Sequence, residues 1–337
     1  MQPQEWTRAL AQYRVPDTGR SIFELIVTVV PLFALWGAAW FALSFSLWIA
    51  IPLAIVNGFF LVRLFIIMHD CGHGSYFKSR TACTWTGRVL GVLTITPYDV
   101  WRQTHAIHHS STGNLDRRGM GDIPTLTVKE YLNRNWLGRA AYRLTRNPVI
   151  LFGIVPAYVF FVQNRLPFGL MRSGKLYWIS AMGTNAALVA IAALIYWVGG
   201  WEVLAFVFVP TLTVASSIGI WLFYIQHQFE HTTWEREEGW NLQNAAFYGS
   251  SHYALPGILR WLSGNIGVHH VHHLASRIPF YRLNEVLRDY AELDDCQRIT
   301  LVESLACAKL HLWDENNQRL LTFAEALATT STQKLSV

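Results

Sequence analysis

Residues 47–73, LWIAIPLAIVNGFFLVRLFIIMHDCGH, decide how this chain folds. An apolar run of this length is typical of a helix that crosses a lipid bilayer, which needs about 20 such residues. The run ends in H-D-C-G-H, where His69 and His73 are four residues apart and would lie on one face of a continuing helix. The stretch therefore predicts a membrane span that carries two imidazoles just beyond the bilayer.

The composition of the whole chain also indicates a membrane protein. Of the 337 residues, 52% are apolar and only 15% are charged, whereas a soluble chain carries about 25% charged residues. Residues 44–46 and 199–201 are short breaks between apolar runs, which predicts two tight helical hairpins. The four expected spans are about 22–43, 47–68, 177–198 and 202–225.

The basic residues predict the orientation of these spans. No Lys or Arg occurs from Ser21 to Val62 or from Leu176 to Glu235, so all 27 lie in the two tails and the middle segment. The positive-inside rule places these three parts in the cytoplasm. The net charge of +5 is then explained by the orientation of the spans in the membrane. For this reason no nucleic-acid partner is expected. The predicted fold is a single all-α membrane domain, 1–337, with a cytoplasmic helical cap formed by 69–176 and 226–315.

A fifth apolar run, 148–163, is shorter and is interrupted by Pro156. We expect it to lie at the membrane interface or to re-enter the bilayer without crossing it. The segment 89–101 is also expected to lie flat at the interface. If 148–163 crossed the bilayer, the histidines that follow 225 would face the wrong side. An even number of spans must separate histidine groups that meet at one site.

The histidines are grouped at helical spacing. Two H-x-x-H-H triplets place three imidazoles each at positions i, i+3 and i+4, and a further pair follows the fourth span at i and i+4. Imidazole is the commonest protein ligand for iron, copper and zinc, so the groups together predict metal binding. Beside His69 and His73, these groups are His105, His108 and His109; His227 and His231; and His269, His272 and His273.

The number of imidazoles indicates two metal ions, because one tetrahedral zinc takes only four ligands. Repeated E-x-x-H pairs on the spans are absent, which argues against a ferritin-like di-iron bundle. The sequence also lacks H-E-x-x-H, G-x-x-x-x-G-K-[ST], G-x-G-x-x-G and a serine-nucleophile elbow. The four cysteines form no C-x-x-C pair, which argues against an iron–sulfur cluster or c-type haem.

Four segments resemble the membrane fatty acid desaturase family, in particular bacterial acyl-lipid enzymes of the delta-12/omega-6 kind. They are HDCGHGSYF, WRQTHAIHHSSTGNLDRRGMGDIPTLTVKEY, QHQFEHTTW and NIGVHHVHHLASRIPFY, between about 60 and 290. The resemblance implies an enzyme of the inner membrane that uses two non-haem irons, O₂ and two external electrons to insert a cis double bond into an acyl chain. The first group, H-x-x-x-H, favours a lipid-linked chain over an acyl-CoA.

The resemblance also implies the metal ligands and the electron donor. A ferredoxin is the expected donor, with a cytochrome b5-like protein as the alternative. His231 is expected to be a spare or supporting residue, and His270 lies about 100° off the face of its triplet. His252 and His311 are isolated and are not expected to bind metal. The implied ligands are His69, His73, His105, His108, His109, His227, His269, His272 and His273.

Carboxylates near the histidines are candidates to orient the rings, since a metal-bound imidazole usually donates its second N–H to such a group. The candidates are Asp70, Asp116, Asp122 and Glu230. Two other functions stay open at this point. The same metal pair could hydroxylate or ketolate an alkane, a fatty acid or a carotenoid. A metal transporter or sensor is the other alternative, although its ligands are expected inside the spans.

Overall fold

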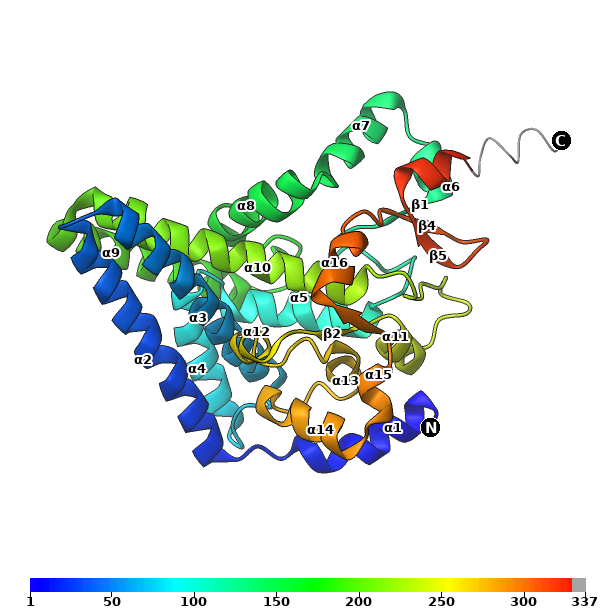
Figure 1. Ribbon diagram of the computed structural model, residues 1–337, viewed down its shortest axis with the longest axis horizontal. Helices are drawn as coiled ribbons and strands as arrows, with labels where there is room; N and C mark the ends of the chain where they lie inside the picture. The colour runs from blue at the N-terminus through cyan, green and yellow to red at the C-terminus, as the bar shows by residue number, and fades with distance from the viewer. Residues whose placement is uncertain (329–337) are drawn as a thin grey trace.

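The computed structural model describes residues 1–328, and most of them are helical (Figure 1). The chain begins with the short helices α1 (Pro3–Ala9) and η1 (Leu10–Arg14), and α1 packs its Trp6 ring against Tyr290, 5.2 Å between centroids. Asp17 then caps the first long helix, its side chain accepting the backbone N–H of Arg20.

The first two long helices are α2 (Thr18–Leu43) and α3 (Leu47–His73). They pack along one another, and the buried Asn57 amide of α3 donates to the Leu32 carbonyl of α2 at 3.0 Å. Helix α3 ends only at Gly74, whose φ of 64° is the left-handed conformation that favours glycine at this position. His69 and His73 are therefore on the same continuous helix as the predicted span.

The third apolar segment runs from Lys175 to His227 and is divided near its middle. It comprises α9 (Lys175–Val203), a π-helical turn η4 (Leu204–Phe208) and α10 (Val209–His227). Gly200 has φ 81° and ψ 178°, which is not helical. A Cβ on the preceding Gly199 would meet the Trp40 ring near the end of α2, so the break lies beside that end.

Both ends of this segment return to the cap. Ser180 accepts a hydrogen bond from the backbone N–H of Asp99, and His227 at the other end lies 3.1 Å from His269. The chain therefore reverses at the break. Within residues 1–328, three helical segments are long and apolar enough to cross a membrane, namely Thr18–Leu43, Leu47–His73 and Lys175–His227.

The fifth apolar run follows a bend in the chain. Helix α7 (Trp136–Thr145) and the segment Ile150–Arg165 meet at 61°, and they would make a fourth candidate span if counted together. That segment contains η2 (Ile150–Ile154), α8 (Val155–Phe161) and η3 (Gln163–Arg165). In Figure 1, α8 lies beside α10, and α7 extends away from it. Whether this run crosses the bilayer stays a prediction.

The remaining helices form the cap. They include α4 (Arg80–Leu93) and α5 (Tyr98–Ser111), which follow α3, and α13 (His269–Leu274), which carries the last histidine triplet. The others are α6 (Val128–Leu132), α11 (Leu242–Tyr248), α12 (Gly257–Leu262), η5 (Phe280–Arg282), α14 (Leu283–Asp289), α15 (Glu292–Asp295) and α16 (Leu301–Cys307).

The cap also contains two small sheets, which corrects the all-α prediction. Strand β4 (Leu312–Asp314) pairs in parallel with β1 (Leu126–Thr127) and antiparallel with β5 (Arg319–Leu321). Strand β2 (His252–Ala254) pairs in parallel with β3 (Arg298–Thr300). Because β5 belongs to the first sheet, the folded cap extends beyond the predicted limit of 315.

Candidate metal centre

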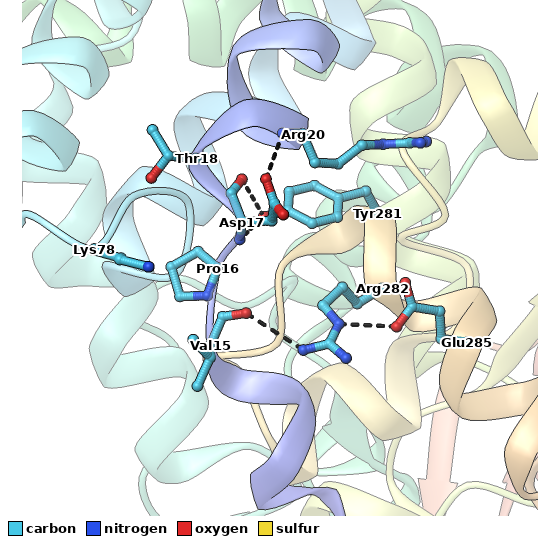
Figure 2. Close-up of a pocket in the computed structure, with 9 residues that line it drawn as sticks. All are labelled: Val15, Pro16, Asp17, Thr18, Arg20, Lys78, Tyr281, Arg282 and Glu285. Atoms are coloured by element: carbon cyan, nitrogen blue, oxygen red, sulfur yellow. Dashed lines mark hydrogen bonds and ion pairs between the residues drawn. The ribbon is translucent and has the colours of Figure 1, made fainter.

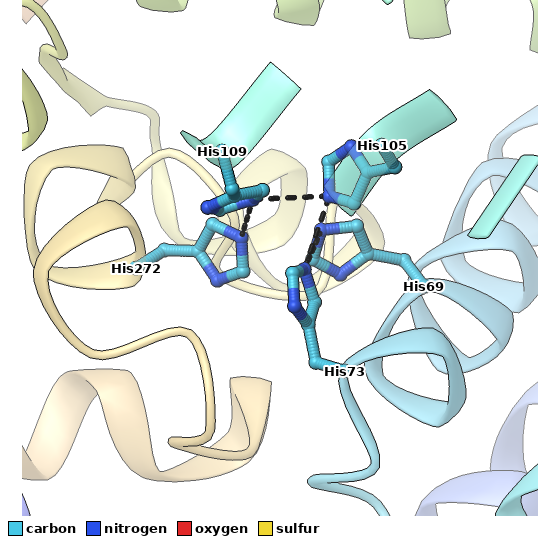
Figure 3. Close-up of side chains that lie close together, drawn as sticks. All are labelled: His69, His73, His105, His109 and His272. Carbon is cyan, nitrogen blue, oxygen red and sulfur yellow. Dashed lines mark hydrogen bonds between the residues drawn. The ribbon is translucent and has the colours of Figure 1, made fainter. Parts of the chain in front are cut away.

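Five imidazoles converge between three helices, and we call them the five-imidazole cluster (Figure 3). Their Nε2 atoms form a chain of close contacts: His69 to His73 at 3.3 Å, His73 to His105 at 3.0 Å, His105 to His109 at 3.1 Å and His109 to His272 at 3.2 Å. Helix α3 supplies the first two rings, α5 the next two and α13 the last.

Four more imidazoles form a second group, the four-imidazole cluster, and all four rings are buried. His269 Nε2 lies 3.1 Å from His227 Nε2 and 3.0 Å from His273 Nε2. His108 completes the group, with its ring centroid 4.7 Å from that of His227. The cluster is built from α5, the last residue of α10, and α13.

Each histidine triplet contributes to both clusters. On α5, His105 and His109 belong to the five-imidazole cluster and His108 to the four-imidazole cluster. Residues i and i+4 are about 40° apart on a helix, whereas i+3 and i+4 are about 100° apart, which directs the middle ring to another site. Helix α13 divides its triplet in the opposite sense, with two rings in the four-imidazole cluster and His272 in the other.

Three imidazoles are oriented through their Nδ1 atoms. His69 Nδ1 contacts Asp70 Oδ1 at 3.2 Å, and His108 Nδ1 contacts Asp122 Oδ1 at 2.5 Å. His227 Nδ1 donates to the carbonyl oxygen of Gly249 at 3.1 Å. With the proton on Nδ1, each ring presents an unprotonated Nε2 lone pair to its cluster, which is the orientation that metal-binding histidines adopt.

The spacing of the lone pairs fits metal ions. Two nitrogens that each lie about 2.1 Å from one ion, at tetrahedral or octahedral angles, are about 3.0–3.4 Å apart. The observed Nε2–Nε2 contacts in the five-imidazole cluster range from 3.0 to 3.3 Å. In addition, the buried Nε2 of His108 has no hydrogen-bond partner among residues 1–328. Lone pairs that face each other without a cation repel, so the donor set is compatible with one ion per cluster.

The electrostatics keep the rings neutral. Burial, followed by the neighbouring imidazoles, holds the pKa of His105, His109 and His272 well below the ordinary value of 6.5. The same two causes lower the pKa of His269 and His273. Neutral imidazole is the form that binds metal, so these rings need not lose a proton at neutral pH before binding.

Two of the four predicted orienting carboxylates contact the clusters and two do not. Asp70 and Asp122 are in place, and Asp70 also accepts the backbone N–H of Phe280 at 2.7 Å. Asp116 instead binds Arg236 at the surface, 2.7 Å from its Nη1, and Glu230 is exposed. The prediction for these two residues is wrong because Arg236 holds Asp116 at the surface and Glu230 lies beyond the end of α10.

The other histidines lie outside both clusters. Helix α10 ends at His227, so His231 does not continue its face and is exposed. His270 is buried, but its Nε2 donates to the Leu293 carbonyl at 3.0 Å, as its position off the triplet face predicts. His252 Nδ1 donates to the Asp294 carbonyl. His311 packs on Phe323, 4.5 Å between ring centroids.

Two residues near the site were missed from the sequence. The Trp101 ring stacks on His105, with 4.6 Å between centroids and 16° between planes, and only a glycine at 72 leaves room for it. Its position four residues before His105 was the available signal. Arg63 of α3 is 1% exposed and pairs with the buried Glu24 of α2. The available signal was the position of Arg63 inside the predicted span 47–68, because a charged residue in a span usually has a partner or a function.

The fold and the site together define a helical membrane protein with paired polyhistidine clusters. The family model for "Fatty acid desaturase" matches residues 46–302. The chain is 41% identical over 317 residues to "Fatty acid desaturase" of Bacillus subtilis (strain 168), covering 94% of this chain and 90% of that one. It therefore belongs to the fatty acid desaturase family, as the resemblance of the four segments predicts.

Two cyanobacterial relatives are more distant. The chain is 29% identical over 262 residues to "sn-1 acyl-lipid omega-3 desaturase (ferredoxin)" of a Synechocystis strain, covering 73% of this chain and 69% of the relative. It is 28% identical over 251 residues to "sn-1 oleoyl-lipid 12-desaturase" of Anabaena variabilis, covering 73% and 70%. Membership of this family makes the chain an oxidoreductase of lipid metabolism.

Proposed function

We propose that this protein inserts a cis double bond into the acyl chain of a membrane lipid, with O₂ as oxidant and two electrons from a ferredoxin-type donor. The observation that carries the proposal is the pair of imidazole clusters, within a chain of the desaturase family. Two relatives, one named as an acyl-lipid desaturase with ferredoxin and one as an oleoyl-lipid desaturase, support the substrate class and the donor.

The nine clustered histidines would hold two irons, one in each cluster. The iron pair, when bound, supplies the activation of O₂ that breaking an unactivated C–H bond requires. The residues of the chain have other tasks. The neutral imidazoles bind without a proton to lose, and Asp70, Asp122 and the Gly249 carbonyl fix the ring orientations. Burial of the four-imidazole cluster keeps bulk water from it.

We place the protein in the bacterial inner membrane with four spans in two hairpins, the clusters and both termini being cytoplasmic. The absence of Lys and Arg from 21–62 and 176–235 supports this orientation. The reversal at Gly200 supports two spans within Lys175–His227. An unbroken helix of 53 residues would be about 80 Å long, far more than a bilayer core of about 30 Å.

The decisive experiment is gas chromatography with mass spectrometry of fatty acids from a bacterial strain that expresses the chain and a ferredoxin. The expected product is two hydrogens lighter than its precursor. A product with an added oxygen would replace the proposal by hydroxylation. Iron should be measured on the purified protein in parallel, because material without iron that still makes the product would contradict the metal assignment.

A further inference from the structure

A polar cavity of about 750 Å³ lies at the start of α2, and no histidine belongs to its lining (Figure 2). Arg20 of α2, Lys78 of the loop after α3, and Arg282 of η5 contribute three cationic side chains to its lining. A volume of this size lies in the range of about 300–1,000 Å³ that is typical of small-molecule sites. The cavity therefore has both the room and the charge for an anionic group.

Two of the three cations are held in position by carboxylates. Arg20 Nε lies 2.7 Å from Glu24 Oε1, and Arg282 Nε lies 2.9 Å from Glu285 Oε2. Arg282 also donates through Nη1 to the carbonyl oxygens of Gln12 and Val15, at 3.4 and 3.3 Å. An arginine has five N–H donors, so each side chain still keeps Nη donors for a ligand. Lys78 is exposed and belongs to no ion pair within the described part of the chain.

The acidic residues of the cavity are already engaged. Asp17 accepts the backbone N–H of Arg20 at 2.8 Å and so caps α2, while Glu285 is paired with Arg282. Glu24 is shared with the buried Arg63, which also donates to the Trp261 carbonyl and, at 3.1 Å, to the Thr28 hydroxyl. This buried network fixes the carboxylate that holds Arg20.

The location matches a lipid headgroup. The cavity is at the start of the first apolar helix, where lipid phosphates lie at a membrane surface. It is also joined to the five-imidazole cluster by short stretches of chain. Lys78 follows His73 by five residues, and Phe280, beside the lining residue Tyr281, donates its backbone N–H to Asp70, which contacts His69.

We propose that this cavity binds the phosphate of a glycerophospholipid headgroup, through Arg20, Lys78 and Arg282. The inference rests on the proposed function, because it names the lipid class whose acyl chain reaches the clusters. Arginine forks bind phosphate oxygens in pairs, and lysine adds a point charge. The headgroup contact anchors the lipid at the membrane surface while its acyl chain enters the protein.

The test is isothermal titration calorimetry on the full-length, iron-loaded protein in a non-ionic detergent. The probes are dihexanoyl-phosphatidylglycerol, an uncharged dihexanoyl galactosylglycerol, and inorganic phosphate. We expect the phospholipid to bind most tightly. Replacing the exposed lysine, Lys78→Gln, should weaken phospholipid binding about fivefold, which corresponds to about 1 kcal/mol. Lys78→Arg should retain binding.

The matched control is Lys309→Gln, which removes an exposed lysine elsewhere in the cap and should leave all three affinities unchanged. Equal binding of the galactolipid, or unchanged phospholipid binding in Lys78→Gln, would overturn the inference. Inorganic phosphate binding as tightly as the phospholipid would assign the cavity to a free anion instead. Since the titration needs no turnover, lysine-dependent lipid binding without a desaturated product would defeat the proposed function and leave the headgroup site standing.

Discussion

The two imidazole clusters share helices α5 and α13 but differ in number and enclosure. The five-imidazole cluster has three partly exposed members, His73, His105 and His109, whereas every ring of the four-imidazole cluster is buried. Besides α5 and α13, the five-imidazole cluster takes two rings from α3, and the four-imidazole cluster takes one ring from α10. If each cluster holds one iron as proposed, we expect the two to tolerate the loss of an imidazole unequally, since one would retain four imidazoles and the other only three.

The largest expected effect is the loss of a ring from the four-imidazole cluster. His108→Ala should abolish the desaturated product and remove roughly half of the bound iron, because three imidazoles hold an ion less tightly than four. His109→Ala, in the five-imidazole cluster, should lose less iron. Iron per protein and the fatty acid profile measure both effects.

The control for this pair is His231→Ala, which removes an exposed histidine outside both clusters and should keep iron and product. Equal iron loss in His108→Ala and His109→Ala would refute the unequal tolerance of the two clusters. Full activity of His108→Ala would refute its assignment as a ligand.

A smaller effect is expected from the carboxylates that orient the rings. Asp122→Asn and Asp70→Asn should each reduce activity or iron affinity by about 10–100-fold, the usual loss for such partners. Asp70→Asn should also lower the thermal stability, because Asp70 holds the Phe280 backbone as well as His69. Melting curves of the two variants without iron measure this difference in stability. Identical melting temperatures for Asp70→Asn and Asp122→Asn would contradict the structural role of Asp70. Asp116→Asn, at the surface pair with Arg236, is the matched control.

The smallest effect concerns the packing around the five-imidazole cluster. A Cβ at position 72 would lie 2.7 Å from the Trp101 ring, which stacks on His105. Gly72→Ala should therefore displace this ring pair and lower activity several-fold, and it should disturb the absorption of the bound metal. The control, Gly183→Ala, adds a methyl group where nothing lies within 4 Å. It should leave both the activity and the absorption of the bound metal unchanged. Unchanged spectra in Gly72→Ala would show that the Trp101 contact does not position His105.

The sequence predicts those contacts of the site that lie within a single helix. Positions i and i+4 place His105 beside His109 whatever the rest of the chain does. The assignment of His108 to the other cluster depends on where α10 and α13 pack, and no local pattern contains that information. The Gly249 carbonyl is a further case, since every residue has a backbone oxygen and only the tertiary fold selects this one.

The errors have equally specific causes. The expectation that Glu230 orients a ring assumes that the helix continues past His227, but Gln228 has φ −114° and ψ 77° and ends it. The small sheets were missed because strands of two or three residues are too short to show an alternating pattern. The positive-inside rule counts Arg63 with the basic residues of the cytoplasmic middle segment, but its charge is buried against Glu24.

The division of each triplet between the clusters has a consequence for assembly. Because α5 and α13 both reach into both clusters, two bound ions would be kept apart by the angle of about 100° between adjacent histidines on each rigid helix. An ion bound first would immobilise the helices that serve the second, so the second would meet donors that are already ordered. We therefore expect cooperative loading, with fewer molecules holding a single ion than two independent sites would produce.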